Sequence, residues 1–184
     1  MRADAQANRD RLLVVAGAVL AEQGVDASMR DIARKAEVGL ATLLRHFPTR
    51  EALLEALLRT GFDELTARAA EVEATRSPQE ALMGWMREFV GLTTDYHGVV
   101  TSMVKAIEEP ESALHASCVA LRAAGAQLLV RAQAAGVART DVDGADLFSL
   151  VSAFAWLGDQ PGQEARAKRL FDLVMGAVLT DSAV

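Results

Sequence analysis

The stretch ASMRDIARKAEVGLATLLRHFPTR, residues 27–50, decides the fold that the sequence predicts. Ser28 can cap a first short helix, because its side-chain oxygen accepts from backbone N–H groups that have no partner in the first turn. The triplet Glu-Val-Gly at 37–39 predicts a tight turn before a second helix. Pro48 ends that second helix because proline disfavours helical geometry in the residue before it, and Thr49 caps the next one. We therefore expect two short helices joined by a turn, with a third helix behind them.

The second helix, over about residues 40–46, presents two different faces. Leu43 and Phe47 lie one turn apart and are expected to face inward. This leaves Leu40, Ala41, Thr42 and Arg45 for solvent or a partner. A helix with short outer side chains fits the major groove of DNA, which is about 12 Å wide. Residues 27–50 also hold five basic and two acidic residues, and this local positive charge suits phosphate binding.

Three motifs in this region carry a resemblance to a known family: RDIA at 30–33, TLLRHFP at 42–48 and REALL at 50–54. In their order and spacing, residues 9–58 resemble the DNA-binding domain of the TetR family of bacterial repressors. The resemblance covers about the first third of the chain and implies a three-helix helix-turn-helix domain.

The resemblance also implies which residues meet DNA. Those from the first motif helix would meet the DNA backbone or the edge of the groove, those early in the second would face base edges, and His46 and Arg50 would bind phosphates. The expected set is Ser28, Met29, Arg30, Leu40, Ala41, Thr42, Leu44, Arg45, His46 and Arg50. Leu44 departs from the usual tyrosine and cannot bond a phosphate. Glu37 stands where glycine is common; glutamate tolerates unusual backbone angles less well and brings negative charge near DNA.

Composition predicts an all-α protein of about nine helices, because half of the 184 residues are hydrophobic and strand-like alternation is missing. We expect a helix-turn-helix domain over residues 1–61 and a helical bundle over residues 62–184. The net charge of −6 is unevenly divided: the first range holds nine basic and eight acidic residues, and the second holds ten and seventeen. The acidic bundle is expected to face away from DNA.

Several kinds of site are not expected. The single cysteine, Cys118, cannot form an intrachain disulfide, and no Cys/His cluster has zinc-binding spacing. We expect Cys118 to be a buried apolar residue, with a redox sensor as the alternative. The sequence shows no signal peptide and no apolar run near 18–20 residues. It therefore predicts a cytoplasmic protein with no metal, no cofactor and no membrane partner.

The last two expected helices, over about 143–157 and 162–180, carry apolar residues on wide arcs. A wide arc favours a second burial surface, such as a four-helix homodimer interface. The expected interface residues are Val151, Phe154, Ala155, Leu170, Leu173, Val174 and Ala177. The alternative is a deeply buried hairpin within a monomer.

The middle helices are the expected ligand chamber. Bulky, adaptable side chains there could line it, namely Trp85, Met86, Phe89, Met103 and Ile107. The alternative is that the same residues form plain core, which is the commoner role of such a pattern.

These observations predict a DNA-binding transcriptional regulator, a repressor in the first instance, released from a palindromic operator by a small-molecule effector. One alternative is a ligand-independent DNA-binding or scaffold protein. The other is a small helical-bundle enzyme that uses His97 with Asp95 or Glu108 as acid and base, but the sequence holds no nucleophile motif or phosphate loop to accompany them.

Overall fold

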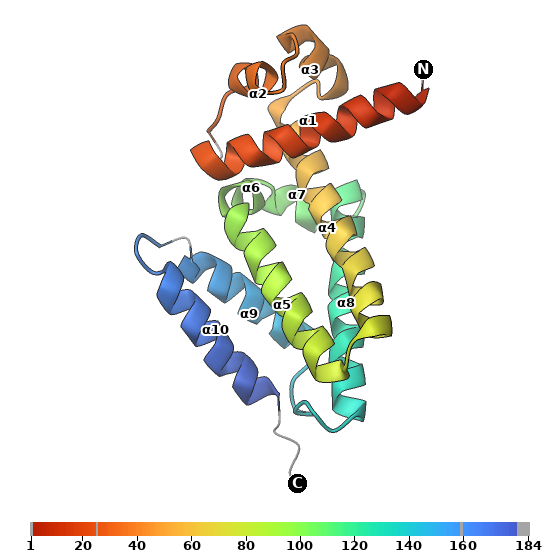
Figure 1. Cartoon of the computed structure of the whole chain (residues 1–184), viewed down its shortest axis with the longest axis vertical. Helices are drawn as coiled ribbons and strands as arrows, with labels where there is room; N and C mark the ends of the chain where they lie inside the picture. Colours follow the sequence, from red (N-terminus) through yellow and green to blue (C-terminus); the bar gives the residue numbers. More distant parts are fainter. Residues whose placement is uncertain (1, 25, 159, 180–184) are drawn as a thin grey trace. The chain divides into compact units, whose positions relative to one another are not determined.

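A computed structural model describes residues 2–24, 26–158 and 160–179, with the backbone alone for residues 2–6 and 97. This part of the chain contains ten helices and no strand (Figure 1). They are α1 (Arg2–Gln23), α2 (Met29–Lys35), α3 (Leu40–His46), α4 (Arg50–Thr75), α5 (Pro78–Asp95), α6 (His97–Ser102), α7 (Val104–Glu108), α8 (Ala113–Ala134), α9 (Gly144–Gly158) and α10 (Glu164–Val178). The all-α class is confirmed. About nine helices were expected, and the structure has two short helices, α6 and α7, that meet at Met103.

The chain divides into two compact units. Residues 1–60 group with 98–115, and residues 61–97 group with 116–184. The sequence did not indicate that 98–115, which hold α6 and α7, would join the N-terminal residues. The boundary expected near residue 61 lies inside α4, a continuous helix with residues in both units.

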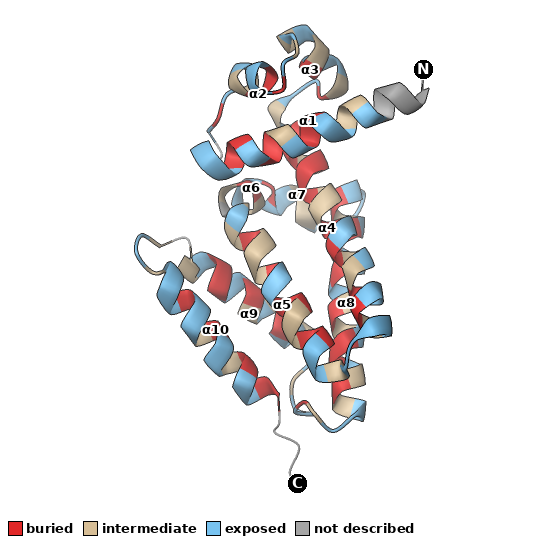
Figure 2. Cartoon of the chain, in the orientation of Figure 1, coloured by how far each residue is buried: buried red, intermediate tan, exposed pale blue. Residues whose placement is uncertain are grey.

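The N-terminal unit is built around α1, which packs on α2, and α2 packs on α3. Ala33 lies at the buried face of α2, where its small side chain lets a neighbouring helix approach closely. Figure 2 shows the buried residues of α1 and α4 as red bands. The core of this unit includes Leu12, Leu13, Ala16, Val19, Leu20, Ile32, Leu43, Phe47, Leu53, Leu54 and Leu58.

The turn between α2 and α3 has an unusual residue in its left-handed position. Glu37 has a φ of +56°, a conformation that glycine adopts most readily. Its N–H donates to Arg34 O at 3.1 Å, and the N–H of Val38 donates to Ala33 O at 3.0 Å. These two bonds form a Schellman turn, in which the last carbonyls of a helix find donors just beyond its end. The expectation that this position favours glycine is confirmed.

The second unit packs α5 against α9 and α9 against α10. Ser77 and Glu80 form a reciprocal capping box at the start of α5, with Pro78 in the first turn. Further along α5, the indole N–H of Trp85 donates to Leu65 O of α4 at 2.8 Å. The Trp85 ring lies so close to α8 that a Cβ added at Gly125 would be 2.7 Å from it. A glycine at that position therefore allows α5 and α8 to approach.

Helix α8 differs from one sequence expectation. By length and composition alone it could cross a membrane, whereas no such apolar run was expected. The core helix of a folded protein passes the same test, and Leu121, Leu128 and Leu129 of α8 are buried inside the molecule. In the last turn of α8, the Gln133 side chain donates to Arg139 O and Val142 O, which ties the loop before α9 to the helix.

Candidate functional site

The outer face of α3 is the first candidate site, and its burial matches the sequence expectation. Leu43 and Phe47 are completely covered, with exposures of 0% and 1%. Ala41 and Arg45 are exposed, and Leu40 and Thr42 are half-buried. The helix therefore turns short side chains outward, the geometry that a groove-binding helix needs. None of the ten residues expected to meet DNA is buried.

Part of the expected positive charge around α2 is paired within the chain. Asp31 accepts from the Ser28 hydroxyl at 2.6 Å and from Arg34 Nη2 at 2.7 Å. Ser28 Oγ in turn caps α2 by accepting from the Asp31 N–H at 3.1 Å. Lys35 forms an ion pair with Glu22 of α1. The first motif helix is thus fastened by its own polar network, and the Ser28 hydroxyl is engaged in it.

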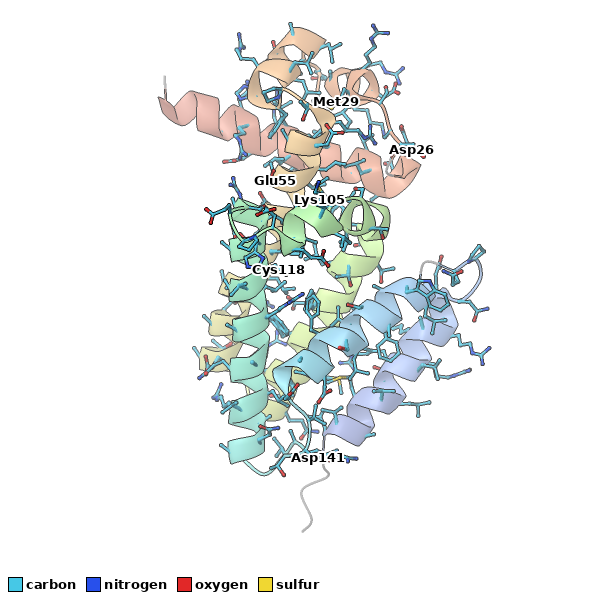
Figure 3. The ribbon with its side chains drawn as sticks, turned by 180° about the vertical axis from the view of Figure 1, so that it is seen from behind. Asp26, Met29, Glu55, Lys105, Cys118 and Asp141 are labelled. Carbon is cyan, nitrogen blue, oxygen red and sulfur yellow. The ribbon has the colours of Figure 1, made fainter. Side chains whose placement is uncertain are left out.

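Arg30 and Arg45 are the expected cations that stay available. Both side chains are exposed, and neither has a hydrogen bond or ion pair among the described residues. Met29, half-buried at the start of α2 beside Arg30, is labelled in Figure 3. Two unpaired guanidinium groups, one on each motif helix, can bind phosphates without breaking an internal contact.

Arg50 makes a contact within the chain that the resemblance did not imply. Its Nη1 donates to the carbonyl oxygen of Ala27, in the loop before α2. Its Nη2 is buried and has no hydrogen-bond partner among the described residues. Arg50 therefore links the start of α4 to the start of the helix-turn-helix. A guanidinium held in this way can position the motif, and its phosphate contact stays a prediction.

Two side chains lie beside the ring of Phe47 at the end of α3. The ring of His46, which is half-buried, lies 6.4 Å from the Phe47 ring between centroids. The Arg9 guanidinium of α1 lies over Phe47 at 5.1 Å from its centroid. Leu44 is exposed on the same helix. The buried Phe47 thus fixes α3 to α1 and leaves His46 at the edge of the outer face.

The expected ligand chamber is filled by its own side chains. Trp85, Met86 and Phe89 are buried, and the space that they line with α8 and α9 is about 10 Å³. The aromatic rings pack at 5.3 Å between Trp85 and Phe89. Met103 and Ile107 belong to the other compact unit. Trp85, Met86 and Phe89 are thus packed as core, the alternative arrangement, and the ligand role of the five residues stays a prediction.

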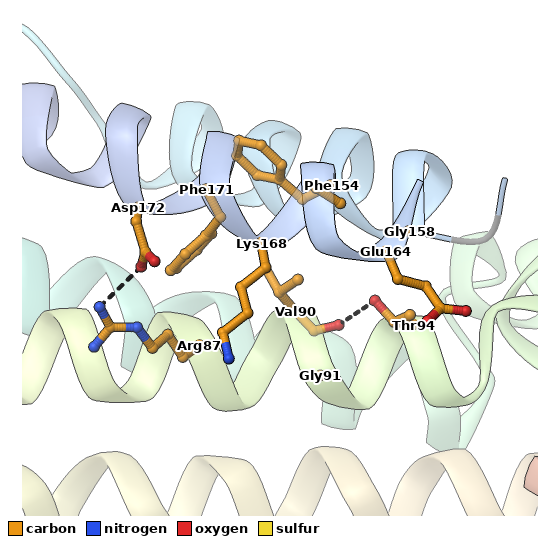
Figure 4. A pocket seen from close by; sticks show the side chains of 11 residues that line it. Arg87, Val90, Gly91, Thr94, Phe154, Gly158, Glu164, Lys168, Phe171 and Asp172 are labelled. Carbon is orange, nitrogen blue, oxygen red and sulfur yellow. Dashed lines mark hydrogen bonds and ion pairs between the residues drawn. The ribbon is translucent and has the colours of Figure 1, made fainter. Parts of the chain in front are cut away.

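A larger groove lies between α5, α9 and α10, with a volume of about 350 Å³ (Figure 4). Sites for small molecules usually have volumes of about 300–1,000 Å³, so this groove falls within that range. Its walls combine the apolar Phe154 and Phe171 with the charged Arg87, Lys168 and Asp172. No local pattern in the sequence predicts it, because α5 lies about 60 to 85 residues before the parts of α9 and α10 that complete its walls.

The expected dimer-interface residues fall into two groups. Val151, Phe154 and Ala155 of α9 are buried within a single chain, so they are covered before any partner arrives. The residues of α10 lie further out: Leu173 is 63% exposed, Ala177 is exposed, and Leu170 and Val174 are half-buried. Helix α9 presents Trp156 instead, with 59% exposure.

The remaining candidates are Cys118 and the residues of the alternative acid–base set at 95, 97 and 108. Cys118 of α8 (Figure 3) is buried, and burial raises the pKa of its thiol although Arg122 acts in the opposite direction. A raised pKa favours the unreactive thiol. The side chain of His97 lies outside the described residues, and Asp95 and Glu108 are exposed. Among the residues searched, no group of three or more His, Cys, Asp or Glu side chains could hold a metal ion.

Comparisons with known proteins agree with this geometry. Residues 12–57 match the family model of bacterial regulatory proteins, TetR family, and residues 77–177 match that of the C-terminal domain of SbtR-like transcriptional regulators. A TetR transcriptional regulator of Streptomyces coelicolor is 34% identical, with a TM-score of 0.77 over 95% of this chain and 99% of that one. A TetR regulatory protein of Mycobacterium vanbaalenii is 32% identical, with a TM-score of 0.74 over 97% and 99% of the two chains.

A curated relative adds to these matches over a shorter stretch. The transcriptional repressor KstR2 of Mycobacterium tuberculosis is 37% identical over 95 residues, which are 50% of this chain and 48% of the repressor. The match thus spans about half the length of that relative. The C-terminal family model alone covers more than half of this chain. The chain therefore belongs to the TetR family of bacterial regulatory proteins.

Proposed function

We propose that the protein is a homodimeric, DNA-binding transcriptional repressor of the cytoplasm, released from a palindromic operator by a small molecule. The observation that carries this proposal is the outer face of α3: its residues are uncovered, while Leu43 and Phe47 anchor the opposite face in the core. Family membership supports the same function. Two such helices in a dimer would enter successive major grooves about 34–36 Å apart.

On this proposal, different residues of the motif read sequence and bind phosphates. Thr42, half-buried on α3, can contact base edges through its hydroxyl and methyl groups, with Leu40 and Ala41 beside it. Arg30 and Arg45 supply the phosphate contacts, because they are exposed and unpaired among the described residues. Arg50 fixes the motif to α4 and acts through its geometry.

The proposal is tested by selecting binding sites from random DNA and titrating the selected operator at several salt concentrations. Arg45→Ala should weaken binding to all sequences alike and flatten the dependence of affinity on salt, by about one phosphate contact per subunit. Thr42→Ala should instead change the selected sequence. Arg76→Ala, which removes an exposed arginine between α4 and α5, is the matched control and should change neither. Failure of the wild-type chain to prefer any sequence would contradict the proposal.

We further propose that the dimer forms through the exposed apolar side chains of α9 and α10. Leu173 and Trp156 are 63% and 59% exposed, so glutamate at either position should leave the monomer folded but introduce charge into the interface. Val130→Glu is the control, since Val130 is 56% exposed on α8. Sedimentation velocity should show a monomer for Leu173→Glu and a dimer for Val130→Glu. A wild-type monomer at micromolar concentration would contradict this arrangement.

A further inference from the structure

The groove between α5, α9 and α10 contains open space directly above a glycine. Gly91 lies on α5 at the groove, and a Cβ added there would meet no atom within 4 Å. The apolar wall opposite is formed by Phe154 of α9 and Phe171 of α10, whose rings pack edge to face at 5.6 Å between centroids. An apolar ligand body could therefore lie over Gly91 against two aromatic rings without displacing a side chain.

The charged side chains that line the groove are two cations, Arg87 and Lys168, and two carboxylates, Asp172 and Glu164. Arg87 of α5 forms an ion pair with Asp172 of α10 at 2.9 Å. Lys168 lies one turn before Asp172, and Figure 4 shows its side chain extending from α10 toward α5 beside Arg87. Lys168 has no hydrogen bond or ion pair among the described residues, although Glu164 is four residues earlier on the same helix. Asp172 is thus paired with Arg87, whereas the Lys168 ammonium has no partner among the described residues and can take an anion.

We propose that this groove binds a carboxylate with an apolar body. The carboxylate would be held by Lys168 with Arg87, and the apolar body would lie over Gly91 against Phe154 and Phe171. The proposal rests on the proposed control by a small molecule and names the class of that molecule. It also supplies a route to the dimer, because α10 contributes both Lys168 in the groove and Leu173 on the exposed face.

The ligand class is tested by calorimetric titration of the purified full-length chain with three probes of equal chain length: decanoate, decanol and decylamine, each below the concentration at which it forms micelles. Decanoate should bind most tightly, by about ten-fold over decylamine, because the amine brings a like charge to Lys168 and Arg87. Equal or tighter binding of decylamine, or no binding of any probe, would overturn the proposal.

Two variants locate the binding. Gly91→Leu should fill the groove and remove binding of decanoate and decanol, and it should fold because the added side chain enters open space on a helix. Lys168→Met should remove the preference for decanoate over decanol and keep the affinity for decanol. The control Arg169→Met removes a neighbouring exposed cation that does not line the groove, and should keep the preference. Unchanged decanoate affinity in Gly91→Leu would place the ligand elsewhere and overturn the proposal.

Operator binding is measured separately, so that the two proposals can fail independently. Decanoate should release the wild-type chain from its selected operator and leave Gly91→Leu bound to it. A wild-type chain that binds decanoate but selects no operator would contradict the proposed function and support the ligand class. A chain that selects an operator and binds no probe would support the proposed function and contradict the ligand class.

Discussion

Helices α2 and α8 end in the same hydrogen-bonded turn, but the residue in the left-handed conformation is Glu37 in one and Gly136 in the other. In each turn this residue donates to the carbonyl three positions back, and the valine after it, Val38 or Val137, donates to the carbonyl five positions back. The N···O distances are 3.1 and 3.0 Å at α2, and 2.9 and 3.0 Å at α8. Both turns thus need a residue in the left-handed conformation. Only the turn after α8 has glycine there, which adopts this conformation without strain.

The difference teaches that the helix-turn-helix carries backbone strain that the second unit avoids. A left-handed conformation costs a residue with a Cβ about 1–2 kcal/mol. The Glu37 side chain is exposed and has no hydrogen bond or ion pair among the described residues that would offset this cost. The strain therefore lies in the turn that sets the angle between α2 and α3, next to the proposed DNA-binding face.

The largest effect on stability is expected from a variant that also places a glutamate in the left-handed position of the second turn. Gly136→Glu should lower the free energy of unfolding by about 1–2 kcal/mol. Its φ of +72° lies in the same left-handed region as the +56° of Glu37, so a residue with a Cβ carries the same kind of cost there. No atom lies within 4 Å of the added Cβ, so the loss comes from the backbone. Urea unfolding followed by circular dichroism measures it.

The control for that variant is Ala135→Glu, which adds the same charge at the neighbouring exposed position. It should unfold close to the wild-type midpoint. Equal stability of Gly136→Glu and wild type would show that the two turns do not differ in strain.

A smaller effect of opposite sign is expected at the first turn. Glu37→Gly should raise the free energy of unfolding by about 0.5–1 kcal/mol, because relief of strain exceeds the extra freedom that glycine gives the unfolded chain. Glu37→Ala keeps a Cβ in the left-handed conformation and should give no such gain. The two variants are compared by the urea midpoint, and a gain of equal size in both would assign the effect to the lost side chain instead of the backbone.

Most of the N-terminal unit could be predicted from the sequence because its signals are local. Ser28 caps α2, Pro48 follows α3, and Leu43 with Phe47 faces the core, as their spacing indicates. Even the unusual turn at Glu37 was indicated by the family pattern. The contact of Arg50 with Ala27 could not be predicted in this way, because it joins residues 23 positions apart. Arginine side chains are usually exposed, so the residue type alone does not indicate such a partner.

The second unit was predicted only in outline because its site depends on how distant helices pack. The apolar pattern of Trp85, Met86 and Phe89 is the same whether these residues form a core or line a chamber. In the structure they leave a space of only about 10 Å³ and pack as core. The groove at Gly91 exists because a residue without a side chain faces α10, and periodicity gives little weight to such a position. Helix periodicity likewise placed Val151 and Phe154 on an apolar arc without showing which part of that arc α5 and α10 cover.

The smallest expected effect separates charge from strain at Glu37. Glu37→Gln keeps the shape of the side chain and removes its negative charge from the helix-turn-helix, so operator affinity should rise about two- to three-fold at low salt. The gain should shrink as salt increases, because the charge is exposed and screened. Fluorescence anisotropy with the selected operator at low and high salt measures both. If Gln and Gly raise the affinity equally, charge alone is responsible. If only Gly raises it and the gain persists at high salt, the strained turn itself holds α3 away from its best angle in the groove, and the comparison with Gly136 would then describe DNA binding as well as stability.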